Sequence, residues 1–383
     1  MNHQRYAATI LLSFAMFVLT SGLCLAQGKS YSVKSPDAKT ELRIGVSGKI
    51  TISIFHNGQE VVLPTSISME LASGMRIGSS PVVKSMKPGS FRRTIEPVVP
   101  EKRKVIPDIY NELLIEFKGN YSVKVRAYDD GVAYRFVTDM AGTVKVRNEE
   151  LSLTLAPNDS IWFPDETSFL SHSERLYRLL AISDIADTQM CCLPAVIVKS
   201  NGLKVAVSES DLLDYAGLYL RGSGGGQPVL QSKFPPYPLE EQLYRDRTVK
   251  ITKTADYIAE TKGVREFPWR VFAIAEKDGD LIENDIIYRL GSPLRLKETS
   301  WIKPGKVAWD WWNANNLHGV SFKSGINTET YKHFIDFASR WKIEYVIFDE
   351  GWSKPSNLFE LNPDMNMEGL FAFAKEKNVG IIL

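Results

Sequence analysis

Two short apolar stretches of this chain, 307–312 and 345–348, end in acidic, amide and tryptophan side chains. The side chains at these two ends that could bind a ligand are Trp309, Asp310, Trp312, Asn313, Asp349 and Glu350. Short apolar runs of this kind are typical of buried parallel strands, and ligands bind at the carboxyl ends of such strands. Carboxylates and amides can hydrogen-bond to sugar hydroxyl groups, and an indole ring offers a flat apolar face to a pyranose ring. We therefore expect these six residues to contact a carbohydrate substrate.

The same residues also have structural interpretations. Asp310 could cap the end of its strand, and Asp349 could begin a turn in which Gly351 adopts a positive φ. Side chains alternate along a strand, so the three tryptophans of the first stretch should not all face one pocket. At least one of them is expected to be packed against the protein.

A predicted β-α-β-α-β pattern positions the polar ends of these two apolar stretches. Apolar runs predict strands at 307–312, at 343–348 and from residue 379, with a helix beginning at Asn327 or Thr328 and another at 366–377. The side chains expected to face inward from these helices are Tyr331, Phe334, Ile335, Ala338, Trp341, Met367, Leu370, Phe371 and Ala374. The even spacing of the strands is typical of a (β/α)8 barrel or of a doubly wound sheet. The first strand is not followed by the glycine fingerprint GxGxxG, which favours the barrel.

Residues 296–383 therefore predict the first three strands of a (β/α)8 TIM barrel, which would be incomplete. Residues 28–295 give a different pattern. Apolar and polar residues alternate over 50–54 and 121–127, turn signals such as Asn57-Gly58 recur, and the main helical candidate is 281–290. This pattern predicts a large antiparallel β-sandwich. The fold class is thus multidomain, β and then α/β.

The first 26 residues resemble a secretory signal peptide. Arg5 provides the positive start, an apolar run follows, and Ala26 ends a set of small residues suited to cleavage. A transmembrane anchor is the alternative, but no basic stop-transfer cluster follows the run. We expect an exported, periplasmic protein without an integral membrane segment after cleavage. Cys191 and Cys192 then remain, and adjacent cysteines are expected to be buried thiols rather than a disulfide or a zinc site.

Bulk charge excludes one class of partner. The net charge is +1, from 46 basic and 45 acidic residues, so no overall field favours nucleic acid. One acidic cluster, formed by Glu209, Asp211 and Asp214, follows the apolar run 205–207. It is either a solvated turn or a set of carboxylates for calcium, which prefers hard oxygen ligands. The Gly-rich segment 222–238 is expected to be a flexible loop, since it lacks the sequence of a phosphate-binding loop.

The chain resembles glycoside hydrolase family 97 from about residue 31 to residue 383. The most specific motifs are RAYDDGVAYRF at 126–136, SESDLLDYAGLY at 208–219, WIKPGKVAWDWWN at 301–313 and YVIFDEGW at 345–352. The resemblance implies a signal peptide, an N-terminal β-super-sandwich (28–295), a catalytic (β/α)8 barrel and a small C-terminal β-domain. It also implies a Ca²⁺ ion in the active site, for which Glu209 looks like the ligand from the N-terminal domain.

The tryptophan and acid motifs are similar to the retaining, α-galactosidase-like branch of the family. In that branch an Asp nucleophile and a Glu acid/base lie further along the barrel, so both are expected beyond Leu383 and the chain alone should be inactive. An inverting α-glucosidase of the same family and a non-catalytic carbohydrate-binding protein are the alternatives. A nicotinamide-dependent oxidoreductase is disfavoured by the missing glycine fingerprint. An oligosaccharide is the expected partner, and the sequence does not predict an oligomeric state.

Overall fold

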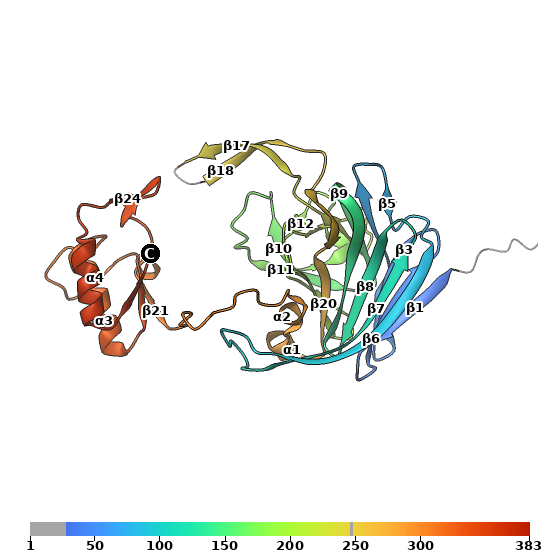
Figure 1. Cartoon of the computed structure of the whole chain (residues 1–383), viewed down its shortest axis with the longest axis horizontal. Helices are drawn as coiled ribbons and strands as arrows, with labels where there is room; N and C mark the ends of the chain where they lie inside the picture. Colours follow the sequence, from blue (N-terminus) through green and yellow to red (C-terminus); the bar gives the residue numbers. More distant parts are fainter. Residues whose placement is uncertain (1–27, 246–247) are drawn as a thin grey trace, which may run out of the picture.

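The computed structural model describes residues 28–245 and 248–383, and the predicted signal segment 1–26 lies outside them. Most of the described chain is β-structure (Figure 1), dominated by one 18-stranded sheet that folds over on itself. Its strands are β1 (Lys29–Lys34), β2 (Thr40–Val46), β3 (Ile50–His56), β4 (Gln59–Leu71), β5 (Arg76–Ile77), β6 (Val83–Ile95), β7 (Ile106–Phe117), β8 (Tyr121–Tyr128), β9 (Gly131–Thr154), β10 (Ser160–Glu166), β11 (Tyr177–Ala181), β12 (Met190–Cys191), β13 (Ala195–Val198), β14 (Lys204–Ser210), β15 (Tyr219–Gly222), β16 (Val229–Lys233), β19 (Ala259–Glu266) and β20 (Trp269–Ala275).

Strand β9 connects the parts of this sheet. Its 24 residues pair antiparallel with β8 and β20 near the start, and with β19 and β4 further along. Alternating apolar residues from these strands, such as Ile52, Val123 and Val205, are fully buried in one core. The antiparallel sandwich expected from the alternation is present because each strand turns one side chain in two toward this core.

A smaller apolar cluster lies on the outer face of the same sheet. Tyr110, Tyr128 and Trp269 pack there against Ile286 and Leu290 of the short helix α2 (Ile286–Leu290), which follows a second short helix, α1 (Asp278–Glu283). The single helix expected over 281–290 is therefore two helices, because the chain is extended at Asn284. The segment 222–238 also differs from the expected loop, since β15 and β16 pair across it and Gly224, Gly225 and Gly226 form a tight turn with positive φ.

A two-stranded hairpin, β17 (Pro238–Tyr244) and β18 (Thr248–Thr254), projects from the sandwich. After α2 the described chain has no helix or strand until residue 307. Cys191 and Cys192 are buried and unbridged, as expected. Within the described residues, no helix combines the length and apolarity needed to cross a membrane.

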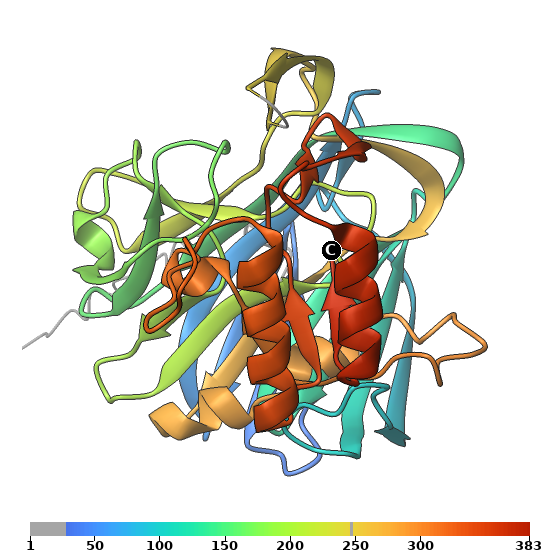
Figure 2. The same cartoon turned by 90° about the vertical axis from the view of Figure 1, so that its left-hand side faces the viewer.

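The C-terminal part is a parallel β-α-β unit that stands apart from the sandwich in Figure 1. Its elements are β21 (Val307–Trp309), the 3-10 turn Trp311–Asn313, α3 (Thr328–Trp341), β22 (Tyr345–Ile347), the hairpin β23 (Ser353–Lys354) and β24 (Asn357–Leu361), α4 (Met367–Glu376) and β25 (Gly380–Ile382). Strand β22 is central and pairs parallel with β21 and β25. Figure 2 shows α3 and α4 side by side over one face of this sheet.

The helix predictions for this unit are correct in position and partly wrong in orientation. Asn327 caps α3 by accepting from the Thr330 backbone N–H at 3.0 Å, as its residue type favours. Trp341 and Phe371 were expected to face inward, but they are 64% and 45% exposed. Both lie at the edges of their apolar stripes, where the described residues provide no neighbouring element to cover them.

Candidate functional site

The two tryptophan and acid motifs meet at the same edge of the parallel sheet. Trp309 pairs with Ile347 in the register of β21 and β22, so both strands deliver their next residues to one side. The indole Nε1 of Trp309 donates a hydrogen bond to Asp349 Oδ2 at 2.7 Å. The structure therefore brings together the motifs that are 40 residues apart in the sequence.

The tryptophans form one stack instead of alternating. The ring of Trp309 lies 5.8 Å from that of Trp311 and 5.5 Å from that of Trp312, with interplanar angles of 25° and 27°. The alternation argument fails here because β21 ends at Trp309 and the chain turns into a 3-10 helix. Their exposed fractions are 38%, 54% and 77% for Trp309, Trp311 and Trp312, so the stack presents a large aromatic surface to solvent.

Asp310 lies beneath this surface and not on it. It is 1% exposed, its Oδ1 accepts from the Trp311 backbone N–H at 2.6 Å, and its Oδ2 accepts from the Tyr331 hydroxyl. Burial, together with this carboxylate, raises the pKa of Tyr331. The geometry supports the capping role weighed for Asp310, because a substrate cannot reach a carboxylate whose two oxygens are buried against the protein.

Three further residues lie at this edge with exposed side chains, namely Asn313, Asp349 and Glu350. The Asn313 Nδ2 donates to the Asn316 backbone oxygen at 2.8 Å, which fixes the turn after the tryptophans. Gly351 has φ of +91°, and a Cβ there would lie 2.5 Å from Ile326. The turn expected after Asp349 is therefore present, and it leaves the two acids at the surface.

The predicted calcium ligand Glu209 is engaged within the sandwich. Its Oε2 accepts from Arg270 Nη1 at 2.6 Å, and both its oxygens accept from the Leu218 backbone N–H, at 3.1 and 3.2 Å. Arg270 is 1% exposed and also binds Glu149 through Nε and Nη2, both at 2.7 Å. Tyr215 completes the group with a hydrogen bond from its hydroxyl to Glu149.

This cluster places two carboxylates on one buried guanidinium. Burial raises the pKa of Glu209, and the positive charge of Arg270 opposes that rise. Arg270 and Glu149 were not predicted as site residues. The sequence did indicate a buried ion pair at Arg270, because a lone arginine in the apolar run 269–275 requires a buried carboxylate partner.

Asp211 and Asp214, the other two acids of the cluster expected from the sequence, have different partners from Glu209. Asp211 accepts from Arg135 Nη2 at 3.0 Å, and the backbone oxygen of Asp214 accepts from Arg265. Among the described residues, no group of three His, Cys, Asp or Glu side chains is arranged to hold a metal ion. The residues present do not fit a complete calcium site, since they offer one carboxylate that already has protein partners.

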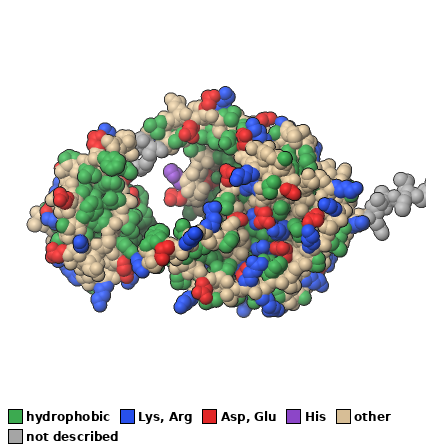
Figure 3. Space-filling view, viewed as in Figure 1, with side chains coloured by type: hydrophobic (Ala, Val, Ile, Leu, Met, Phe, Trp, Pro, Cys, Tyr) green, Lys and Arg blue, Asp and Glu red, His purple; other side chains and the backbone are tan. Residues whose placement is uncertain are grey.

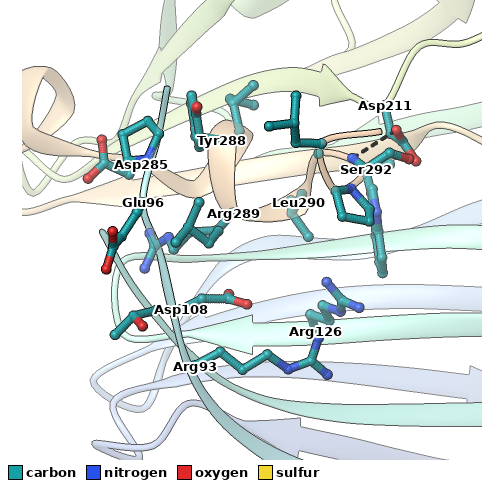
Figure 4. A pocket seen from close by; sticks show the side chains of 18 of the residues that line it. Arg93, Glu96, Asp108, Arg126, Asp211, Asp285, Tyr288, Arg289, Leu290 and Ser292 are labelled. Atoms are coloured by element: carbon teal, nitrogen blue, oxygen red, sulfur yellow. Dashed lines mark hydrogen bonds between the residues drawn. The ribbon is translucent and has the colours of Figure 1, made fainter. Parts of the chain in front are cut away.

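A second concave region lies on the outer face of the sandwich. It is a cleft of about 920 Å³ between the sheet and α2 (Figure 4), lined by charged side chains that include Arg93, Asp108 and Arg126. Sequence reasoning missed this cleft, because its residues come from segments that are widely separated in the chain, from Arg93 to Leu294.

Family models match both parts of the chain. The model for the glycosyl-hydrolase 97 N-terminal domain matches residues 33–293, and the model for glycoside hydrolase 97 matches residues 311–383. A retaining alpha-galactosidase of Bacteroides thetaiotaomicron is 34% identical over 388 residues, covering 97% of this chain and 58% of that protein. A probable retaining alpha-galactosidase of Streptomyces bingchenggensis is 23% identical, covering 99% of this chain and 56% of that protein.

Solved structures share the fold. A family 97 enzyme from Pseudoalteromonas sp. strain K8, in complex with acarbose, superposes with a TM-score of 0.77 at 22% identity, covering 92% of this chain and 53% of that one. A beta-arabinopyranosidase gives a TM-score of 0.74 at 20% identity, covering 92% and 55%. The chain thus spans little more than half the length of the relatives it matches. On the match of its N-terminal 33–293 and of its parallel unit, the chain belongs to glycoside hydrolase family 97.

Proposed function

We propose that this chain provides the sandwich and the first barrel strands of an α-glycosidase that releases terminal α-galactosides with retention of configuration. The observation that carries the proposal is the 34% identity, over 97% of this chain, to a protein named as a retaining alpha-galactosidase. The exposed edge with Trp309, Asp349 and Glu350 supports it, because it offers an aromatic surface beside carboxylates at the carboxyl ends of parallel strands.

In this proposal the tryptophan stack binds the apolar face of a sugar ring, and the neighbouring polar side chains accept from its hydroxyl groups. Trp312 is the most exposed ring of the stack and is proposed as the main stacking surface. Asp349, Glu350 and Asn313 are proposed as hydroxyl partners. Asp310 is proposed to hold the 3-10 turn that carries the rings, through its bonds to Trp311 and Tyr331.

Cleavage with retention needs two further carboxyl groups about 5–5.5 Å apart, one as nucleophile and one as acid/base. We propose that both come from barrel strands after residue 383, together with the strands that close the barrel. The chain as given then binds sugar but does not hydrolyse it. Calcium belongs to the same proposal: Glu209 would supply one ligand, and the remaining ligands would come from outside the described residues.

The test compares the 383-residue chain with the complete gene product on p-nitrophenyl α-galactoside and p-nitrophenyl α-glucoside. We expect no turnover by the chain, and turnover of the galactoside by the complete protein with the α-anomer as the first product in proton NMR. Cleavage of the glucoside alone, or a first product of inverted configuration, would replace this proposal by the α-glucosidase alternative. Sugar binding without turnover by the complete protein would favour a non-catalytic binding protein.

A calcium titration tests the metal separately. Isothermal titration of the complete protein is expected to show one Ca²⁺ site that Glu209→Gln weakens about tenfold or more, as expected for the loss of one charged ligand. Asp214→Asn is the matched control from the same loop. Equal affinity in the Glu209→Gln and Asp214→Asn variants would remove Glu209 from the ligand set.

A further inference from the structure

The outer face of the sandwich carries a second polar surface, built from three adjacent strands. Arg93 on β6 and Asp108 on β7 are directly opposite in the antiparallel register, so their side chains share one face. Arg126 on β8 lies on the same face, opposite Glu112 of β7. Figure 4 shows Arg93, Asp108 and Arg126 on the sheet side of the cleft, with Tyr288 and Arg289 of α2 across from them.

Buried polar atoms without partners gather around this cleft. Asp108 is 5% exposed, and its Oδ1 makes no hydrogen bond of good geometry within the described residues, although the buried Tyr128 hydroxyl interacts with this carboxyl. Nε1 of Trp269, which is fully buried, and Nε of Arg289 also make no such hydrogen bond there, and all three residues line the cleft. A buried polar atom without a partner costs about 1–3 kcal/mol, so native proteins rarely keep several together unless something else satisfies them.

The ion pairs of the lining show which charges are already compensated. Arg126 binds Glu112 at 2.8 Å, Arg135 binds Asp211 at 3.0 Å, and Arg289 binds Asp130. Lys102 binds Asp285 at 3.1 Å. Within the described part of the chain, Arg93 is then the one basic residue of the lining without an ion pair, although Asp108 lies opposite it.

The balance of charge decides which ligand suits the cleft. Five basic and six acidic side chains line it, so it has no excess positive charge to attract an anion. The carboxylate of Asp108 would also repel a phosphate or carboxylate. A ligand must instead accept from the exposed Arg93 while donating to Asp108, which a neutral molecule with neighbouring hydroxyl groups does.

Tyr288 supplies the exposed aromatic surface of such a site, while two buried rings lie beneath Arg126. Arg126 lies over the ring of Trp269 at 4.8 Å and over that of Tyr110 at 4.4 Å. Tyr288 lines the opposite side and is 47% exposed, so its ring is available to a ligand. The volume of about 920 Å³ is within the range of roughly 300–1,000 Å³ that is usual for small-ligand sites.

We propose that the cleft between β6, β7, β8 and α2 is a carbohydrate-binding site of the sandwich, in which Asp108 and Arg93 bind neighbouring hydroxyl groups of a neutral oligosaccharide. None of the residues at the tryptophan edge of the parallel unit lines it. The proposal does not depend on hydrolysis, so it can fail or succeed independently of the proposed glycosidase activity.

The cleft borders the segment that leads to the parallel unit. The Ser292 backbone N–H donates to Asp211 Oδ1 at 3.1 Å, the bond that is dashed in Figure 4. Residues 291–294 complete the lining of the cleft. This contact keeps the start of the connecting segment at the rim of the cleft. A bound sugar would therefore contact both the sheet and the connection.

The test uses the 383-residue chain, because the sandwich carries the whole cleft. The reporter is the indole N–H resonance of Trp269 in a nitrogen–proton NMR spectrum, assigned by its loss in Trp269→Phe. Melibiose, raffinose and maltotriose are titrated as neutral probes, and inorganic phosphate as the anionic probe. We expect saturable movement of the Trp269 resonance with at least one sugar and none with phosphate.

Matched variants then identify the binding residues. Arg93→Met and Asp108→Asn are each expected to weaken sugar binding about tenfold, the loss of roughly one charge-assisted hydrogen bond. Arg92→Met is the control, since Arg92 is exposed on the same strand and does not line the cleft. Trp312→Ala controls for binding at the tryptophan edge and is expected to leave the Trp269 titration unchanged.

Three outcomes would overturn the proposal: a Trp269 resonance that no sugar moves, movement by phosphate alone, or equal affinity in the Arg93→Met and Arg92→Met variants. Circular dichroism separates loss of binding from loss of folding. Asp108→Asn is expected to fold at least as well as the original chain, because it removes a charge that is disfavoured by burial. Unfolding of that variant would leave Arg93→Met as the deciding one.

Discussion

The hydrogen bond from Trp309 Nε1 to Asp349 Oδ2, at 2.7 Å, joins the carboxyl ends of two parallel strands. It fixes the orientation of the central indole ring, on which Trp311 and Trp312 stack. An exposed aromatic stack held by a carboxylate is a rigid surface, and rigid surfaces lose little conformational entropy when a ligand binds. The relationship therefore leads to a prediction about sugar binding at this edge.

Asp349→Ala is expected to weaken the binding of melibiose to this chain about tenfold, because the variant removes both a proposed hydroxyl partner and the anchor of the indole ring. Tryptophan fluorescence titration measures the affinity. Glu376→Ala, which removes an exposed carboxylate from the end of α4, is the control and should bind as the original chain does. Unchanged affinity in Asp349→Ala would remove this edge from the proposed site.

The bond between the Tyr331 hydroxyl and Asp310 supports a prediction about stability. Asp310 is 1% exposed, so Tyr331→Phe leaves a buried carboxylate oxygen without its partner. We expect the free energy of unfolding of the parallel unit to fall by about 1–3 kcal/mol. Urea denaturation followed by tryptophan fluorescence measures the change.

Tyr345→Phe is the matched control, because the Tyr345 hydroxyl donates to the Lys303 backbone oxygen at the surface, where water can replace it. Its effect should be smaller. A loss of stability in Tyr331→Phe no greater than in Tyr345→Phe would mean that Asp310 does not depend on the hydroxyl.

Arg270 compensates two carboxylates, and its removal should be costly and dependent on pH. Arg270→Met leaves Glu149 and Glu209 without their buried cation, which typically destabilises a protein by about 3–5 kcal/mol. Burial raises the pKa of Glu209 above its ordinary value of 4.5, and Arg270 opposes the rise, so the variant's pKa for Glu209 should be higher still.

A carboxyl whose pKa is higher in the folded than in the unfolded state binds its proton more tightly when folded. Its contribution to stability is therefore greatest below the unfolded value of 4.5 and is lost as pH rises through the folded value. The stability deficit of Arg270→Met should accordingly shrink when the pH is lowered from 7 to 5. Denaturant midpoints at these two pH values measure it, and a deficit that grew at pH 5 would contradict this account.

Local patterns in the sequence were sufficient to predict the elements. The strands at 50–54 and 121–127 and the cap at Asn327 were predicted from alternation and capping chemistry, which depend on neighbouring residues. The orientations of Trp341 and Phe371 were wrong, because helical periodicity assumes that a neighbour covers the whole apolar stripe.

The tertiary contacts that form the sites could not be predicted from local sequence patterns. Arg270 and Glu149 are 121 residues apart, and Tyr331 and Asp310 are 21 apart, so only the fold brings each pair together. The strand expected over 307–312 ends at Trp309, because Asp310 caps the turn that follows. The hydroxyl of the buried Tyr331 holds the Asp310 carboxylate in this position. Tertiary contacts of this kind override local propensity.

The last prediction concerns the parallel unit as a whole. Its sheet contains three strands, and β21 and β25 each pair on one side only within the described residues. Val307 and Ile382 on these edges are 45% and 40% exposed, and Figure 3 shows hydrophobic side chains gathered on the visible surface of the unit. By contrast, β8 pairs on both sides, and its Val123 and Val125 are fully buried.

We therefore expect amide hydrogens of β21 and β25 to exchange with solvent at least tenfold faster than those of β8, with β22 intermediate, since exchange follows the cost of local opening. Hydrogen–deuterium exchange with peptide mass spectrometry measures this in the 383-residue chain. The hairpin of β17 and β18, whose residues are exposed throughout, is the internal reference for fast exchange. Protection of β21 and β25 equal to that of β8 would show that the edges are covered by another part of the protein or by a second copy, because unpaired edge strands of this exposure cannot protect their own amides.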